Sequence, residues 1–137
     1  MNQNFILTQI LTPKDAVYYI SNNSTIRQAL EKFAYHKFSV VPVIDEQGKY
    51  LNTLSEGDIL RYIAIENNFD KKLSENTSID DIEHYRSYSS VNISCGFEEI
   101  YELILSQNFI PVVDDRNIFI GIVKRKDVLA YLRKRNS

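Results

Sequence analysis

Apolar residues recur along this chain at a helical period in two places. Positions 26, 29, 30 and 33 are apolar, and so are positions 97, 100, 101 and 104. The spacing i, i+3, i+4, i+7 predicts two amphipathic helices. Each is followed by a short unbroken apolar run, Val40–Ile44 and Ile110–Val113, which is typical of a strand covered on both faces. The pattern therefore predicts a helix followed by a buried strand, and it does so twice.

Turns and further elements follow each buried strand. Asp45–Gly48 and Asp114–Asn117 have the composition of hairpin turns. The sequence then predicts second strands over 50–54 and 118–123, and closing helices over 58–66 and 127–135. Thr25 and Ser94 precede the first helix of each half and are expected to cap it. Each half thus contains helix, strand, strand and helix in that order.

The remaining segments lie at the start of the chain and between the two halves. Apolar residues at 6, 7, 10 and 11 predict a helix over Phe5–Leu11, ended by Pro13. Residues 66–81 are polar and without period, which indicates a surface linker. We therefore expect one domain over residues 1–68, the N-terminal helix with the first half, and a second over residues 69–137, the linker with the second half.

The two halves are copies of one unit. Moved by 69 positions, residues 41–63 align with residues 110–132 without a gap, and six of the 23 positions are identical. The identities are Pro42/Pro111, Val43/Val112, Asp45/Asp114, Asp58/Asp127, Leu60/Leu129 and Tyr62/Tyr131. A fixed offset of this size indicates an internal duplication.

Composition excludes several classes of protein. The chain has 137 residues, 44% of them hydrophobic and 25% charged, which is typical of a globular domain. Its net charge is −2, so we do not expect a surface that binds nucleic acid over its whole area. Residues 124–137 nevertheless carry six cations and one acid. This basic end either complements the dipole of the last helix or contacts nucleic acid, and the net acidity argues against the second.

The sequence shows no pattern that marks an enzyme or a secreted protein. Cys95 is the only cysteine, so no intrachain disulfide is possible and a reducing compartment is expected. The two histidines, His36 and His84, lack the spacing of metal ligands, and the four glycines form no phosphate loop. We find no signal peptide and no apolar stretch of about 20 residues. We expect a cytoplasmic protein with no membrane contact, no required cofactor and no catalytic site.

The doubled motif resembles a known family. In each half a Pro-Val step, 42–43 or 111–112, leads to an aspartate before the turn, and Ser55-Glu-Gly-Asp58 opens the closing helix of the first half. This arrangement resembles the CBS domain, and the tandem over about residues 12–135 resembles the Bateman module. The resemblance implies an α+β fold of two β-α-β-β-α repeats, packed about a pseudo-twofold axis as one globular module. It also implies homodimers that regulate by binding an adenosine-containing nucleotide in clefts between the repeats.

Ser55 and Asp58 carry two interpretations. A serine three residues before an acid at a helix start is the pattern of a capping box, which needs no ligand. A helix N-terminus also offers free N–H groups to a phosphate. By resemblance, Asp58 would hold a ribose and Ser55 would contact a phosphate or ribose oxygen.

The second copy departs from that pattern. Lys124 stands where the first copy has Ser55, and Arg125, Lys126 and Asp127 follow it. A lysine cannot cap the helix, and its charge opposes the positive end of the helix by about 0.3–1 kcal/mol. We expect these cations to face an anion, with solvation as the alternative, so that the second site prefers the more phosphorylated ligand. By resemblance, Asp127 would hold the ribose there.

The walls of the implied sites are apolar. In the family the adenine lies between apolar residues beside the Pro-Val step and the strand that opens each repeat. Here these residues are Val41, Pro42, Ile110, Pro111 and Tyr18 to Ile20. The alternative is that they only form the core. Asn52 replaces the glycine that the second copy keeps as Gly121, so the first cleft is expected to be more crowded.

Two functional hypotheses follow from these residues. The first is a regulatory module that senses AMP, ADP, ATP or a cyclic dinucleotide and relays it through its homodimer or an unidentified protein partner. Such a ligand acts only by binding one arrangement of the protein better than another. The alternative is a structural or adaptor protein with vestigial clefts that acts through protein contacts alone. Nucleotide binding distinguishes the two.

Overall fold

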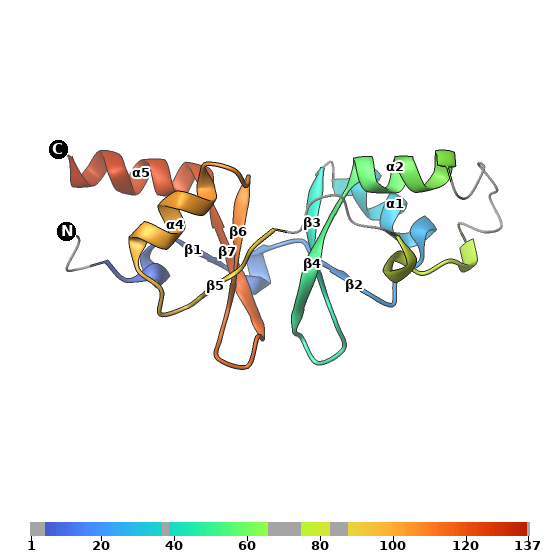
Figure 1. Cartoon of the computed structure of the whole chain (residues 1–137), viewed down its shortest axis with the longest axis horizontal. Coiled ribbons are helices and arrows are strands. Elements are labelled where there is room, and N and C mark those ends of the chain that lie inside the picture. Colours follow the sequence, from blue (N-terminus) through green and yellow to red (C-terminus); the bar gives the residue numbers. More distant parts are fainter. Residues whose placement is uncertain (1–4, 37–38, 66–74, 83–87, 137) are drawn as a thin grey trace. The chain divides into compact units, whose positions relative to one another are not determined.

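The chain forms two compact units, each with helices and one β-sheet, so the fold is mixed α+β as expected (Figure 1). The computed structural model describes residues 5–36, 39–65, 75–82 and 88–136. The first-repeat unit is Tyr18–Ser87, and the second-repeat unit combines Met1–Val17 with Tyr88–Ser137. The segment that opens the chain therefore packs with the second repeat.

The first-repeat unit is built on a three-stranded sheet of order β2-β3-β4. Its elements are β2 (Ile20–Ser21), α1 (Ile26–His36), β3 (Val40–Ile44), β4 (Tyr50–Ser55), α2 (Glu56–Ile65) and the 3-10 turn η3 (Ile79–Asp81). β2 is parallel to β3, and β4 is antiparallel to it. The core side chains come from the helices, the strands and η3, and include Ile20, Ile26, Phe33, Val41, Leu54, Ile59 and Ile79.

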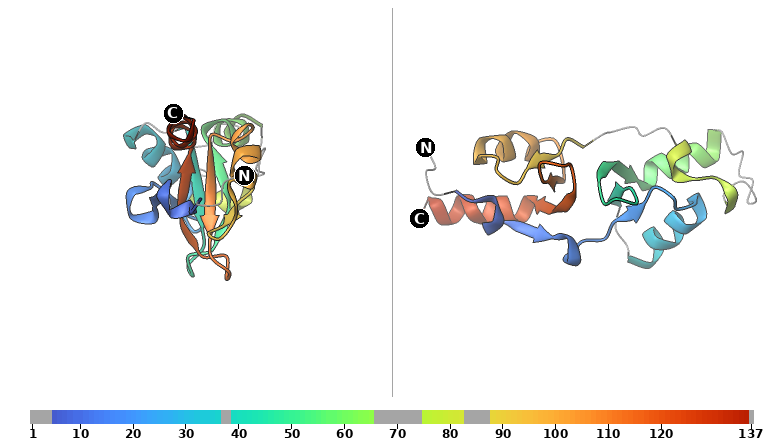
Figure 2. Two further views of the ribbon diagram at one scale, coloured as in Figure 1. Left: turned by 90° about the vertical axis from the view of Figure 1, so that its left-hand side faces the viewer. Right: turned by 90° about the horizontal axis from the view of Figure 1, so that it is seen from below.

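The second-repeat unit repeats this plan with one strand added. Its sheet has the order β1-β7-β6-β5, and β1 is antiparallel to β7 (Figure 2). Its elements are the 3-10 turn η1 (Leu7–Gln9), β1 (Leu11–Pro13), the 3-10 turn η2 (Lys14–Ala16), β5 (Val91–Asn92), α4 (Phe97–Ile104), β6 (Phe109–Val113), β7 (Phe119–Lys124) and α5 (Arg125–Arg135). The core includes Leu7, Ile10, Ile100, Ile110, Val112, Val123 and Val128.

The duplication extends to local irregularities of the two hairpins. The register of each hairpin shifts at one point, between Val43 and Ile44 in the first repeat and between Val112 and Val113 in the second. These points are 69 residues apart, the offset found in the sequence. In the second turn the Asp114 carboxylate accepts a hydrogen bond from the Ile118 N–H at 2.9 Å, and this bond is the main reason that the pKa of Asp114 lies below its usual value.

The predicted helix over Phe5–Leu11 is wrong. The structure has the short turn η1 there, followed by strand β1, which pairs Leu11 with Val123 and Pro13 with Gly121. The apolar spacing at 6, 7, 10 and 11 was compatible with a helix, but pairing with a distant strand overrides that local preference. Pro13 ends β1, where a residue without an N–H group is tolerated.

One of the two predicted caps is confirmed and the other is wrong. Thr25 and Gln28 form a reciprocal capping box: the Gln28 N–H donates to Thr25 Oγ1 at 3.1 Å, and the Thr25 N–H donates to Gln28 Oε1 at 2.9 Å. Ser94 does not cap α4, because Gly96 occupies the N-cap position and the Ser94 hydroxyl donates to Asn92 Oδ1.

The predicted linker is not all surface. Residues 66–74 lie outside the described residues. Further along, Ser78 forms a bridge with Thr25, and Ile79 is only 1% exposed within the first-repeat core. A single apolar residue in a polar stretch gives no period, so the pattern could not assign it to the core.

Candidate functional site

The start of α2 contains the predicted capping box. The Asp58 N–H donates to Ser55 Oγ at 3.1 Å, and the Ser55 N–H donates to Asp58 Oδ2 at 2.9 Å. Arg61 Nη1 lies 3.7 Å from the other carboxylate oxygen, Oδ1. Asp58 is 3% exposed. Both of its oxygens are therefore engaged inside the chain, and its predicted contact with a ribose would require them to change partners.

The start of α5 is open by comparison. Lys124 is the N-cap residue and makes no side-chain capping bond, as expected for a cation. Asp127 lies in the first turn and is partly exposed. Among the described residues, its carboxylate has no hydrogen bond or ion pair. The equivalent aspartates of the two repeats thus differ: one is buried and engaged, and the other is accessible.

Arg125 is directed toward α4. Its guanidinium donates to the Ile104 carbonyl at 3.3 and 3.1 Å and to the Gln107 carbonyl at 2.9 Å. The bonds to Ile104 satisfy the carbonyl of the last residue of α4, where a cation also complements the helix dipole, and the bond to Gln107 lies three residues beyond that helix. The predicted contact of Arg125 with a bound anion would compete with these bonds, whereas Lys124 and Lys126 make none among the described residues.

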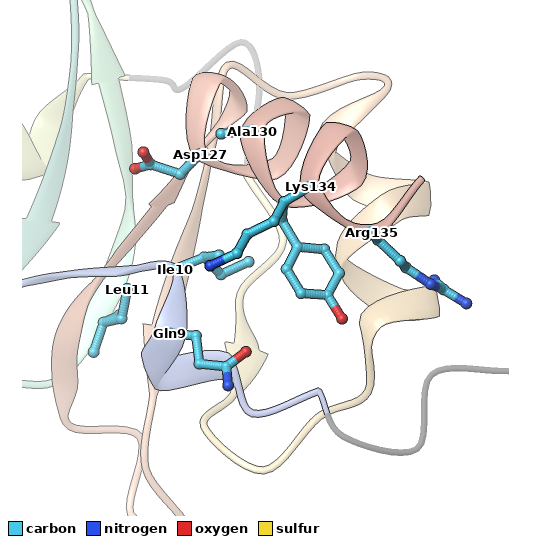
Figure 3. Close-up of a pocket in the computed structure, with 8 residues that line it drawn as sticks. Gln9, Ile10, Leu11, Asp127, Ala130, Lys134 and Arg135 are labelled. Carbon is cyan, nitrogen blue, oxygen red and sulfur yellow. The ribbon is translucent and has the colours of Figure 1, made fainter. Parts of the chain in front are cut away.

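A cavity of about 690 Å³ lies between α5 and the segment that opens the chain, and we call it the α5 groove (Figure 3). It is lined by Gln9, Ile10, Leu11, Asp127, Ala130, Tyr131, Lys134 and Arg135. Asp127 lies at one end along α5, and two cations lie at the other (Figure 3). Of these residues, only Asp127 was predicted. The spacing 127, 130, 131, 134 marks one helical face and could have indicated the others.

The predicted apolar wall residues are mostly core. Val41 and Ile110 are fully buried and Ile20 is 1% exposed. Pro42 and Pro111 are also buried, paired with Thr53 and Ile122 in their sheets. Tyr18 differs, because it is 58% exposed and its ring stacks on His36 with centroids 4.0 Å apart. Contact of any of these residues with an adenine stays a prediction.

Two further properties concern the described residues as a whole. No group of three or more histidine, cysteine, aspartate or glutamate side chains among them is placed to hold a metal ion. None of the helices in the described ranges has both the length and the apolar composition needed to cross a membrane.

Two halves with one topology, an internal offset of 69 residues and an aspartate at the start of each closing helix define a tandem-repeat protein. The CBS domain profile matches residues 7–65 and 72–134, so the chain belongs to the CBS domain family and carries two such domains in tandem.

Similar proteins are found both among known sequences and among solved structures. The uncharacterized protein MJ1232 of Methanocaldococcus jannaschii is 31% identical in an alignment of 118 residues that covers 82% of this chain and 35% of that protein, so this chain spans only a part of that relative. A crystal structure of CbpB in complex with c-di-AMP matches with a TM-score of 0.85 and 26% identity, over 95% of this chain and 85% of that one. CbpB from Streptococcus agalactiae matches with a TM-score of 0.80 and 27% identity, over 92% and 78% of the two chains.

Proposed function

We propose that this chain is a non-catalytic regulatory module that binds an adenosine-containing nucleotide at the start of α5. The observation that carries the proposal is the Asp127 carboxylate, which is partly exposed, has no partner among the described residues and belongs to a residue at one end of the α5 groove. A carboxylate can accept hydrogen bonds from both hydroxyls of the ribose of AMP, ADP or ATP, or from the one free 2′-hydroxyl of a ribose in a cyclic dinucleotide. The similarity to CbpB, solved with c-di-AMP, supports a cyclic dinucleotide as the first candidate, followed by AMP, ADP and ATP.

Charge at the start of α5 favours an anionic ligand. The α5 N-terminus offers N–H groups that no side chain caps, and Lys124 and Lys126 flank it. A phosphate bound there would satisfy those donors and offset the unfavourable placement of cations at the positive end of a helix. A ligand of this kind is a cytoplasmic metabolite, so we expect the protein to act in the cytoplasm.

The same helix connects the ligand site to a second surface, which supports a regulatory role. On another face of α5, Leu129 is 60% exposed and lines a 350 Å³ depression with Tyr101 and Leu105 of the α4 region, which are 45% and 68% exposed. Grouped apolar side chains on a surface are typical of protein contacts. We expect this surface to form the homodimer, or to bind a partner protein, so that a ligand on α5 shifts the contact.

Nucleotide titration of the purified, ligand-free protein tests the proposal. A ligand at 100 times its Kd stabilises the fold by about 2.7 kcal/mol, which raises the melting temperature by several degrees. We expect Asp127→Asn to weaken binding roughly tenfold or more, because charge-assisted hydrogen bonds to the ribose are lost. Glu98→Gln is the matched control, since it removes an exposed carboxylate from the first turn of α4 in the same unit.

Two results would contradict the proposal. No shift with c-di-AMP, AMP, ADP or ATP would favour the alternative, an adaptor that acts through protein contacts alone. Binding by Asp127→Asn that equals binding by the wild type would show that the site lies elsewhere.

A further inference from the structure

The two repeats differ at one position beside their equivalent aspartates. The 69-residue offset places Asp58 on Asp127 and Arg61 on Ala130. In the first repeat the Arg61 guanidinium lies 3.7 Å from the Asp58 carboxylate, which is almost fully buried. In the second repeat, Ala130 has no side chain that could reach Asp127, and both residues line the α5 groove. One aspartate thus carries an internal counterion, whereas the other has none among the described residues and lies at the edge of a cavity.

The far end of the α5 groove is basic. Asp127 and Lys134 are seven residues apart on one helix, so their backbone positions are about 10 Å apart along its axis. Figure 3 shows the Lys134 side chain running from α5 toward Ile10, on the wall of the groove formed by η1 and β1. Arg135 lines the same end. In the first repeat the position equivalent to Lys134 is Ile65, so this basic end belongs to the second repeat alone.

Aromatic packing fixes one wall of the α5 groove. The Tyr131 ring lies edge-on to Phe5, with centroids 5.3 Å apart, and its centroid is 4.9 Å from that of Phe97. Phe5 and Phe97 are in turn 5.3 Å apart, so the three rings form one cluster. Because the rings already hold this wall in place, a ligand does not have to order it. The entropy lost on binding is therefore smaller. The volume of the groove is within the usual range for small-molecule sites.

We propose that the α5 groove is a subsite for a second phosphate of the nucleotide, held by Lys134 and Arg135 while Asp127 holds the ribose. In the second repeat, the small side chain of Ala130 leaves this subsite accessible. In the first repeat, Arg61 occupies the equivalent position and pairs with Asp58. The inference rests on the proposed function, because it assigns a further part of the same ligand. It requires a nucleotide whose two phosphates lie on either side of a ribose, as in a cyclic dinucleotide, and it predicts one bound ligand per chain.

Isothermal titration calorimetry of charge variants with AMP, ADP and c-di-AMP tests the subsite. We expect the double variant Lys134→Gln/Arg135→Gln to weaken c-di-AMP roughly tenfold or more, and to leave AMP and ADP within about twofold of the wild type. Arg133→Gln, which removes an exposed cation of the same helix outside the groove, is the matched control and should leave every affinity unchanged.

A second pair of variants tests whether the small side chain of Ala130 keeps Asp127 accessible to the ligand. Ala130 is exposed, so both Ala130→Arg and Ala130→Gln should fold. We expect Ala130→Arg to weaken every nucleotide, AMP included, because the guanidinium would pair with Asp127 as Arg61 pairs with Asp58. The neutral Ala130→Gln should have a much smaller effect. An equal loss in the two variants would assign the effect to bulk and overturn the role given to Arg61.

The outcomes separate this inference from the proposed function. Unchanged affinity of the double variant for c-di-AMP overturns the subsite, as does an equal loss of affinity for AMP, while the proposed nucleotide binding itself stands. Two ligands per chain overturn the restriction to the second repeat. Failure of the wild type to bind any of the three nucleotides overturns both proposals.

Discussion

Gly121→Ala should disrupt the contact between β1 and β7 that forms one wall of the α5 groove. A Cβ atom at Gly121 would collide with the Thr12 carbonyl oxygen of β1, and it would lie 3.0 Å from Leu11 Cδ1 and 3.1 Å from Pro13 Cα. The residue also has a φ of +155°, which side-chain-bearing residues rarely adopt. Overpacking costs about 1–3 kcal/mol and backbone strain a similar amount. We therefore expect a loss of about 2–4 kcal/mol, or roughly 10 °C in melting temperature.

Thermal unfolding followed by circular dichroism, combined with nucleotide titration, measures both consequences. Displacement of β1 moves Leu11 and its neighbours in the groove wall, so ligand affinity should fall together with stability. Gly57→Ala is the control, because its nearest neighbour would be Ser55 Oγ at 3.7 Å and alanine favours the helix by up to about 1 kcal/mol. A Gly121→Ala protein as stable as the wild type would refute the close approach of β1 to β7.

Three further predictions concern the cap, the surface and the cysteine. Ser55→Ala should lower stability by about 1 kcal/mol in chemical unfolding through loss of the α2 cap, with nucleotide affinity at the second repeat unchanged; a fall in affinity would contradict the assignment of the ligand to Asp127. Leu105→Lys/Leu129→Lys should convert a dimer to a monomer in light scattering, whereas an unchanged mass would exclude this surface from the dimer. Burial, followed by the charge of Glu99, raises the pKa of Cys95 to about 11, so its alkylation near pH 8 should be roughly 100-fold slower than that of a free cysteine, and unfolding should remove this protection.

Features that depend on local pattern were predictable from the sequence. The strand over Val40–Ile44 was predicted with the bounds found, and the α1 and α4 helices begin where the apolar period begins. The capping box of Ser55 and Asp58 follows from two residues three positions apart and is confirmed. Each of these features is determined by neighbours in the chain, which is why its pattern is visible in the sequence.

Features that depend on distant contacts were not predictable. Strand β1 forms because residues 11–13 pair with residues 121–123, more than 100 positions later. The α5 groove requires that pairing, since Gln9, Ile10 and Leu11 supply one of its walls. The direction of Arg125 depends on the end of α4 being close enough to accept its hydrogen bonds. A run of cations in the sequence does not show which of them already has a partner inside the fold.

Calorimetric titration of c-di-AMP into two matched variants, Asp127→Asn and Asp58→Asn, most directly tests whether the second repeat holds the ligand. The substitutions are equivalent by the internal offset, and each changes one repeat. The account predicts one ligand per chain, a loss of affinity of tenfold or more in Asp127→Asn, and wild-type affinity in Asp58→Asn. Equal losses in both variants, or a loss confined to Asp58→Asn, would contradict it.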